Sequence, residues 1–209
     1  MLFEAGAPPS FGRKAEVPVT YPPWVHKAGE GLVARRTPSS DILPLSHGTN
    51  VAMATLFDAG FGTSAQRGTI EHAEYAAIGW IDPDNPADER ARDILSSGWR
   101  EAFVKTDETV ACWRERPYEL FRDGVWESGQ FDRVVFRRTN GVLLATIYDF
   151  KTNRRHGDET VPDFERRMRN TYENQMKMYR AALSELAQMP QDRIAIKLLL
   201  AETMTAVKV

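Results

Sequence analysis

The dipeptide Asn140-Gly141, between two stretches rich in β-branched and aromatic residues, most constrains how this chain can fold. A type I′ turn needs positive φ at both central residues, and asparagine followed by glycine meets that need well. Residues 126–138 and 142–150 are therefore predicted to form an antiparallel hairpin. Continuing the register outward from this two-residue loop places Asp132 opposite Asp149.

The two aspartates share one face of the predicted hairpin with apolar residues. The same register pairs Val134 with Ile147 and Phe136 with Ala145, so this face should point into the core. Opposed carboxylates have Cβ atoms about 5 Å apart, and their burial without a cation would cost several kcal/mol or force one to protonate. A divalent metal removes this problem, and a few carboxylate ligands with open positions suit Mg²⁺ or Mn²⁺.

Lys151 lies two residues beyond Asp149 and on the same face. A lysine beside such a metal can hold an attacking water and stabilise negative charge in the transition state. The alternative is that both aspartates are solvated strand-end residues and that Lys151 is their salt-bridge partner. For Asp149-Phe150-Lys151 alone that alternative would be preferred, and the opposed Asp132 favours the metal site.

Helical and strand patterns surround the hairpin. Apolar spacing predicts helices over about 49–59, 64–79, 87–105 and 162–187. Residues with high β propensity predict strands over 109–121, 193–200 and 205–209. This order predicts an α/β (α+β) fold, in which helices pack on a mixed central sheet that contains the antiparallel hairpin.

The first part of the chain differs from the rest. Seven of the 12 prolines fall in the first 44 residues, which cannot sustain a helix or a central strand. Residues 1–45 are therefore predicted to be a Pro-rich arm or linker, and residues 46–209 the folded domain. The arm carries enough apolar surface to lie against the domain or a neighbour, and a disordered leader is an equal alternative.

Composition excludes several classes of protein. A formal net charge of -2 argues against histone-like binding to nucleic acid. The single cysteine, Cys112, excludes an intramolecular disulfide and an iron-sulfur cluster held by cysteines, and it is interpreted as a strand residue. No run approaches the roughly 18 apolar residues of a membrane helix, and the start lacks a signal-peptide pattern. We therefore expect a cytoplasmic protein without a membrane partner.

Several ordered blocks of sequence carry a more specific signal. They are Arg36-Thr37-Pro38-Ser39-Ser40, Gly68-Thr69-Ile70-Glu71-His72, Arg114-Glu115-Arg116-Pro117-Tyr118, Gly129-Gln130-Phe131-Asp132-Arg133-Val134, Tyr148-Asp149-Phe150-Lys151-Thr152 and Tyr172-Glu173-Asn174-Gln175-Met176-Lys177-Met178-Tyr179. Over residues 36–209 their order and spacing resemble the nuclease domain of RecB and AddA helicase-nucleases, a branch of the PD-(D/E)xK superfamily. The resemblance implies a restriction-endonuclease-like core and a metal-dependent DNA nuclease. The superfamily's Pro-Asp is absent, and Gly129-x-x-Asp132 stands in its place, as in the RecB-like branch.

The resemblance also assigns roles to residues. It implies that the metal ligands are His72, Asp132, Asp149 and the carbonyl of Phe150. It further implies that Lys151 is the catalytic lysine and that Gln175 and Tyr179 border the site. Taken alone, His72 on an alanine-rich helix is more often a satisfied core or surface residue than a ligand. Glu71, Glu74 and Glu115 could also approach the metal, but solvated helix or strand positions are the simpler interpretation for them.

The predicted long helix supports part of this assignment. One stripe at steps of three and four residues contains Phe164, Met168, Tyr172, Gln175, Tyr179, Leu183 and Leu186. A polar amide at Gln175 must find partners in that apolar stripe, and an active site is one place to find them. A core stripe with one satisfied glutamine is the alternative.

Charge and motif content define the expected substrate and partners. Basic residues gather near the predicted site, and those interpreted as DNA-binding are Arg154, Arg155, Arg166, Arg167 and Arg169. No Gly-Lys-Ser/Thr phosphate loop exists, so the chain has no ATP site of its own. The resemblance implies single-stranded DNA as the substrate and a helicase motor in cis or in trans. Two alternatives stay open: a non-catalytic DNA-binding or scaffolding domain, and a stand-alone phage or restriction-type nuclease.

Overall fold

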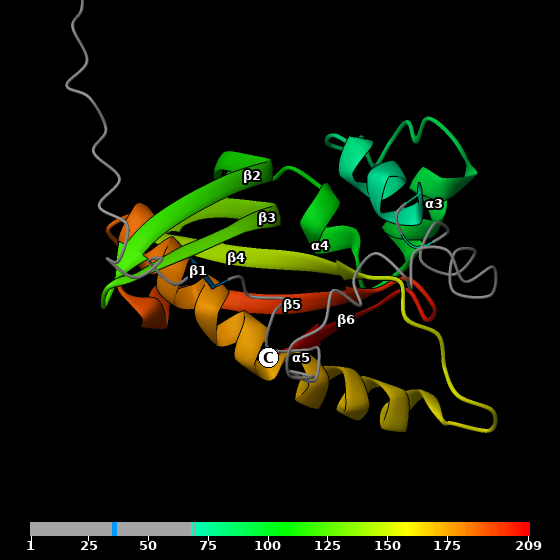
Figure 1. Ribbon diagram of the computed structural model, residues 1–209. Helices are drawn as coiled ribbons and strands as arrows, with labels where there is room; N and C mark the ends of the chain where they lie inside the picture. The colour runs from blue at the N-terminus through cyan, green and yellow to red at the C-terminus, as the bar shows by residue number, and fades with distance from the viewer. Residues whose placement is uncertain (1–34, 37–67, 69) are drawn as a thin grey trace, which may run out of the picture. The chain divides into compact units, whose positions relative to one another are not determined.

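The computed structural model describes residues 35–36, 68 and 70–209 of the chain (Figure 1). Most of the predicted Pro-rich arm and the helix expected over 49–59 lie outside these residues. Within the described part, no helix is long and apolar enough to cross a membrane.

A mixed sheet forms the centre of the fold, as predicted. Its strands are β1 (Arg35–Arg36), β2 (Thr109–Arg122), β3 (Val125–Thr139), β4 (Val142–Lys151), β5 (Ile194–Leu200) and β6 (Thr205–Lys208). The strand order is β1-β3-β4-β5-β6, and β2 also pairs with β3. The β4/β5 and β1/β3 pairs are parallel, whereas β2/β3, β3/β4 and β5/β6 are antiparallel.

The β3–β4 hairpin has the predicted register. Thr139 pairs with Val142, and the pairing continues without a shift to Arg133 and Tyr148. Asn140 and Gly141 have φ values of 51° and 80°, the positive values that their turn requires. The turn chemistry thus determines which residues meet at the far end of the hairpin.

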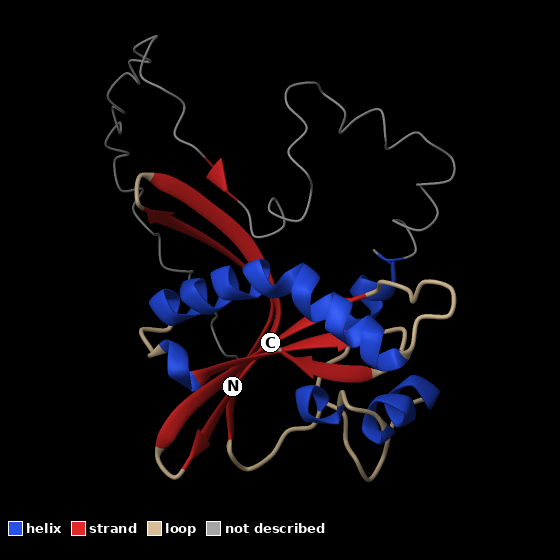
Figure 2. Cartoon of the chain, turned by 90° about the horizontal axis from the view of Figure 1, so that it is seen from below, coloured by secondary structure: helices blue, strands red, loops and turns tan. Residues whose placement is uncertain are grey.

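Helices cover both faces of this sheet. They are α3 (Glu89–Ser96), α4 (Arg100–Phe103) and α5 (Val161–Leu186), with a 3₁₀ turn η3 (Gln191–Arg193) and an unlabelled helical segment at 70–77. We call this segment the His72 helix. The α5 helix runs along one face, and α3 and α4 lie on the other (Figures 1 and 2). Thr160 caps α5 by accepting a hydrogen bond from the Asp163 amide.

The single helix expected over 87–105 is wrong, because the chain breaks between α3 and α4. The Gly98 amide donates to the carbonyl of Met204, and the Trp99 indole donates to the carbonyl of Thr205. A Cβ on Gly98 would lie 3.0 Å from the backbone nitrogen of Ala206. Packing against the β5–β6 connection therefore outweighs local helix propensity here.

Each face of the sheet has its own core. The α5 face buries Val134, Phe136, Ala145 and Ile147, as the alternation predicted. The stripe of α5 packs there as well, except that Leu186 is 40% exposed, contrary to prediction. The opposite face contains Val135, Tyr148 and Phe150, packed against Trp99 and Phe103. Tyr148 and Phe150 are thus core residues and do not offer their rings to bases.

A buried arginine joins the His72 helix to the sheet. Arg133 is 1% exposed, and its guanidinium donates to the carbonyls of Ala102 (2.7 Å), Ile78 (3.0 Å) and Gly79 (3.1 Å). It also lies 4.5 Å and 4.9 Å from the ring centres of Phe103 and Trp80. Carbonyls at the ends of helical segments carry partial negative charge, which stabilises this buried cation.

Candidate metal and nucleic-acid site

The sheet opens at Asp132. On one side, β3 and β4 stop pairing after Arg133 and Tyr148, while β4 continues beside β5 to its end. On the other side, the register pairs Arg114 with Arg133 and Arg116 with Phe131, so Glu115 lies opposite Asp132 without a regular bridge. Asp132 therefore sits where β3 leaves β4 and where its pairing with β2 is interrupted at a single position.

The carboxylate of Asp132 fills this opening. Its Oδ2 accepts a hydrogen bond of 2.8 Å from the backbone N–H of Phe150 and lies 3.0 Å from Nε2 of His72. The hydrogen bond to Asp132 raises the pKa of His72 above its ordinary value, although burial acts in the opposite direction. The His72 ring also packs edge-on against Phe150, with ring centres 5.5 Å apart. His72 and Asp132 thus meet, as the resemblance implied.

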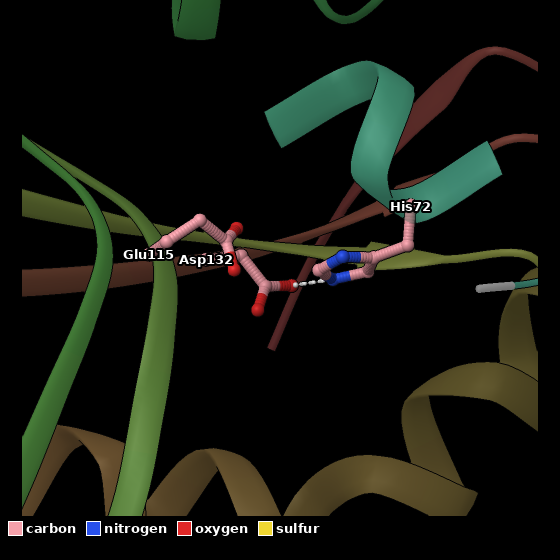
Figure 3. A group of neighbouring side chains, drawn as sticks. All are labelled: His72, Glu115 and Asp132. Atoms are coloured by element: carbon pink, nitrogen blue, oxygen red, sulfur yellow. Dashed lines mark ion pairs between the residues drawn. The ribbon is translucent and has the colours of Figure 1, made fainter. Parts of the chain in front are cut away.

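Glu115 joins these two residues. One ligand atom each from His72, Glu115 and Asp132 lie within 4.8 Å of one another, a spacing that a metal ion could bridge (Figure 3). Glu115 has φ of 46°, an uncommon value for a residue with a side chain, and this local break in β2 is where its carboxylate approaches Asp132. Gln130 donates a hydrogen bond to Oε2 of Glu115. Burial, reinforced by the charge of Asp132, raises the pKa of Glu115.

The sequence contains a signal that places Glu115 beside Asp132. Asp123-Gly124 is a second two-residue turn with positive φ at both positions, 52° and 78°. Counting outward from it, as from Asn140-Gly141, pairs Arg122 with Val125 and puts Glu115 opposite Asp132. The registers set by the two turns therefore predict that Glu115 and Asp149 lie on either side of Asp132.

Asp149 and Lys151 form a buried pair beside this group. The Asp149 side chain is 3% exposed, and its Oδ2 lies 2.6 Å from Nζ of Lys151. Burial raises the pKa of Asp149, against the effect of the Lys151 charge. Burial lowers the pKa of Lys151, but the charge and hydrogen bond of Asp149 outweigh it, so the net shift is upward. The carboxylate of Asp149 and the ammonium of Lys151 thus form a buried ion pair.

The α5 helix supplies the next partners. Nζ of Lys151 lies 3.1 Å from Oε1 of Gln175, and Nε2 of Gln175 donates to the hydroxyl of Tyr179 at 3.3 Å. Gln175 is 5% exposed, so the polar residue in the apolar stripe has its partners at the end of β4. Gln175 and Tyr179 therefore lie beside Lys151.

Four of the five arginines interpreted as DNA-binding contact acidic side chains. Arg154 contacts both Glu71 (2.7 Å) and Glu202 (2.8 Å). The other four contact Glu202 (Arg155), Asp163 (Arg166), Glu159 (Arg167) and the carbonyl of Lys208 (Arg169). Arg166 is the most exposed of the ion-paired arginines, with 66% of its side chain accessible. Any phosphate would have to share these guanidinium groups with carboxylates.

Comparison with known families agrees with this architecture. The family model described as the PD-(D/E)XK nuclease superfamily matches residues 43–207. The chain belongs to the PD-(D/E)XK nuclease superfamily. Members of this superfamily are in general metal-dependent nucleases, and the mixed sheet with helices on both faces is consistent with their restriction-endonuclease-like fold. A search of curated proteins found no match.

The residues present fit the divalent metal that PD-(D/E)XK nucleases use. Within the described part of the chain, Oε1 of Glu115 is buried and has no hydrogen-bond partner, whereas Oδ2 of the buried Asp149 contacts Nζ of Lys151. Buried carboxylate oxygens without donors are costly unless a cation compensates them. Oxygen-rich sites with one imidazole suit Mg²⁺ or Mn²⁺ better than soft metals. His72, Glu115, Asp132 and Asp149 are therefore the candidate ligands.

Proposed function

We propose that this chain is a divalent-metal-dependent deoxyribonuclease that hydrolyses phosphodiester bonds in single-stranded DNA. The observation that carries the proposal is the opening of the sheet at Asp132. There, the Asp132 carboxylate contacts His72 and the backbone N–H of Phe150 near the end of β4. On the same strand, the buried Asp149 pairs with Lys151. A purely structural salt bridge would not require a second and a third acidic side chain at the same opening.

Each residue of the proposed site has a defined task. Asp132, Asp149 and His72 hold Mg²⁺ or Mn²⁺, with the carbonyl of Phe150 as a further ligand. When bound, the ion neutralises charge on the phosphate and lowers the pKa of bound water. Lys151 orients the attacking water and supplies positive charge where the oxyanion develops. Gln175 and Tyr179 border the site and restrict the movement of Lys151.

The remaining proposals concern substrate and partners. The arginines near the end of β4 and the start of α5 neutralise the nucleic-acid backbone by exchanging their carboxylate partners for phosphates. The sequence blocks that resemble RecB and AddA support a role behind a helicase that delivers unwound strands, with the motor in cis or in trans. In that setting the chain acts in DNA repair and recombination.

Cleavage of end-labelled linear and circular single-stranded DNA tests the proposal. The wild type is compared with Lys151→Ala and Asp149→Ala in Mg²⁺, Mn²⁺ or EDTA. Matched controls are Lys177→Ala and Asp192→Ala, which remove the same charges at exposed positions. Circular dichroism verifies that each variant is folded.

Metal-dependent cutting that only the two site variants abolish would support the nuclease and its site, and cutting of circles would identify endonuclease action. If the wild type binds DNA but never cuts it, even with a helicase supplied, the chain is a DNA-binding or scaffolding domain. Equal losses in the site variants and the exposed controls would argue against the assigned site.

A further inference from the structure

We propose that Tyr172 is a positioning residue that holds the Lys151 ammonium in place through a cation–π contact, with Asn153 fixing the orientation of its ring. This inference rests on the proposed function and deepens it. Nζ of Lys151 lies 4.0 Å from the centre of the Tyr172 ring. The Tyr172 hydroxyl donates a hydrogen bond of 2.9 Å to Oδ1 of Asn153.

The Lys151 ammonium is largely shielded from water, and the Tyr172 ring is one of its few neighbours. Lys151 has three N–H donors, and its neighbours are Oδ2 of Asp149 at 2.6 Å, Oε1 of Gln175 at 3.1 Å and the Tyr172 ring. The Lys151 side chain is only 12% exposed. Little water can therefore solvate the cation, and attraction to an aromatic face strengthens when the cation is desolvated.

The Tyr172 ring attracts the Lys151 ammonium in a less directional way than Asp149 and Gln175 do. A carboxylate takes a directed hydrogen bond, whereas a ring attracts the charge through its whole face. A bound cation at the site competes with Lys151 for Asp149. Tyr172 and Gln175 are not among the candidate metal ligands, so they hold the ammonium whether or not Asp149 is engaged elsewhere.

The ring is itself anchored by the strand that carries the lysine. Asn153 follows Lys151 by two residues, at the exit of β4, and Tyr172 projects from α5. Their hydrogen bond joins the two elements on either side of the flexible lysine stem. The stem has four carbons and many rotamers, so this arrangement limits the positions the ammonium can reach.

Nuclear magnetic resonance of protein labelled with ¹³C at lysine Cε tests the contact directly. A proton over an aromatic ring experiences an upfield ring-current shift, and the Lys151 signal is assigned by its loss in Lys151→Arg. We expect the full upfield shift in the wild type and a smaller one in Tyr172→Phe, which keeps the ring but loses its hydrogen bond to Asn153. In Tyr172→Leu it should move back among the signals of the other lysines, and in Asn153→Ala its shift should shrink.

Cleavage kinetics provide the second readout. Tyr172→Leu should lower kcat about tenfold with little change in KM, whereas Tyr172→Phe and Asn153→Ala, which keep the ring but lose its hydrogen bond, should lower kcat by similar and smaller factors. If Tyr172→Leu does not fold, the reduced shift and kcat in Asn153→Ala decide the matter. An unchanged Lys151 shift in a folded Tyr172→Leu, or equal kcat losses in Phe and Leu, would overturn the proposal. If the wild type does not cleave DNA, the proposed function fails, but the resonance shift still decides the contact.

Discussion

The backbone N–H of Phe150 donates its hydrogen bond to the side chain of Asp132, 2.8 Å away, at the level where β3 and β4 no longer pair. The carboxylate takes the position that a strand carbonyl would otherwise occupy. The end of β4 is therefore tied to β3 although the strands have separated. That tie places Phe150, which lies between Asp149 and Lys151, against the aspartate that contacts His72.

Glu115 should contribute to metal binding. The Glu115 carboxylate lies in one group with the Asp132 carboxylate and the His72 imidazole. Glu115→Gln therefore removes a negative charge from the candidate metal ligands. We expect about a tenfold higher Mn²⁺ concentration for half-maximal cleavage. Titration of cleavage rate against Mn²⁺ measures this.

The matched control for that titration is Glu119→Gln, an exposed position on the same strand. It should leave the Mn²⁺ dependence unchanged. Identical Mn²⁺ curves for Glu115→Gln and the wild type would exclude Glu115 from the metal site.

Mn²⁺ should stabilise the folded chain even without DNA. The candidate ligands come from β2, β3, β4 and the His72 helix, so the site exists only when these elements are assembled. At a concentration 100 times the dissociation constant, binding to the folded state adds about 2.7 kcal/mol. Thermal unfolding followed by circular dichroism should show a rise in Tm that EDTA reverses. A similar rise in Asp132→Asn would mean that Mn²⁺ binds elsewhere.

Arg133→Met should destabilise the fold strongly. The substitution keeps a long apolar stem but removes three hydrogen bonds to the carbonyls of Ala102, Ile78 and Gly79, of which the Ala102 bond is fully buried. We expect a loss of about 3 kcal/mol in the free energy of unfolding, because those carbonyls lose their donors. Urea denaturation measures it. Arg138→Met, at an exposed position of β3, should change the stability by less than about 0.5 kcal/mol.

Gly129→Ala should also destabilise, for a steric reason. A Cβ at Gly129 would lie 2.7 Å from the Tyr118 ring, which packs directly over this position. Tyr118 is buried and stacks on Phe131, so the ring has little room to move. Overpacking of this kind costs about 2 kcal/mol, measurable by urea denaturation. Making the same change in a Tyr118→Leu background should cost less, and an equal cost in both backgrounds would contradict the steric explanation.

Arg166 should contribute to DNA binding through the phosphate backbone. Its side chain is highly exposed and contacts only a neighbouring helical carboxylate, Asp163, among the ion pairs of the described residues. Arg166→Ala should reduce the slope of log affinity against log salt for single-stranded DNA by about 0.7. Fluorescence anisotropy at several salt concentrations measures the slope. Arg122→Ala, seven residues along β2 from Glu115, is the control and should leave it unchanged.

Much of the site follows from local rules that act along the sequence. Turn dipeptides set the register of each hairpin, and alternation then assigns residues to faces, so the β3–β4 pairing and the α5-side core agree with the prediction. The polar Gln175 in an apolar stripe needed partners, and it contacts Lys151. The hairpin registers and the faces of the strands depend on residues close in sequence or joined by one short turn, whereas the contact of Gln175 with Lys151 also requires α5 to pack on the sheet.

The sequence by itself therefore determined the sheet with its helices, the hairpin register and the acidic and basic residues at the end of β4. Only the tertiary structure decided how the Asp132 carboxylate ties the end of β4 to β3, how Arg133 is buried against three carbonyls, and why α3 and α4 are separate. Those outcomes depend on contacts between segments far apart in the chain, which neither periodicity nor turn chemistry encodes. Tyr172 over Lys151 is such a contact, since α5 and the end of β4 meet only after the sheet has formed.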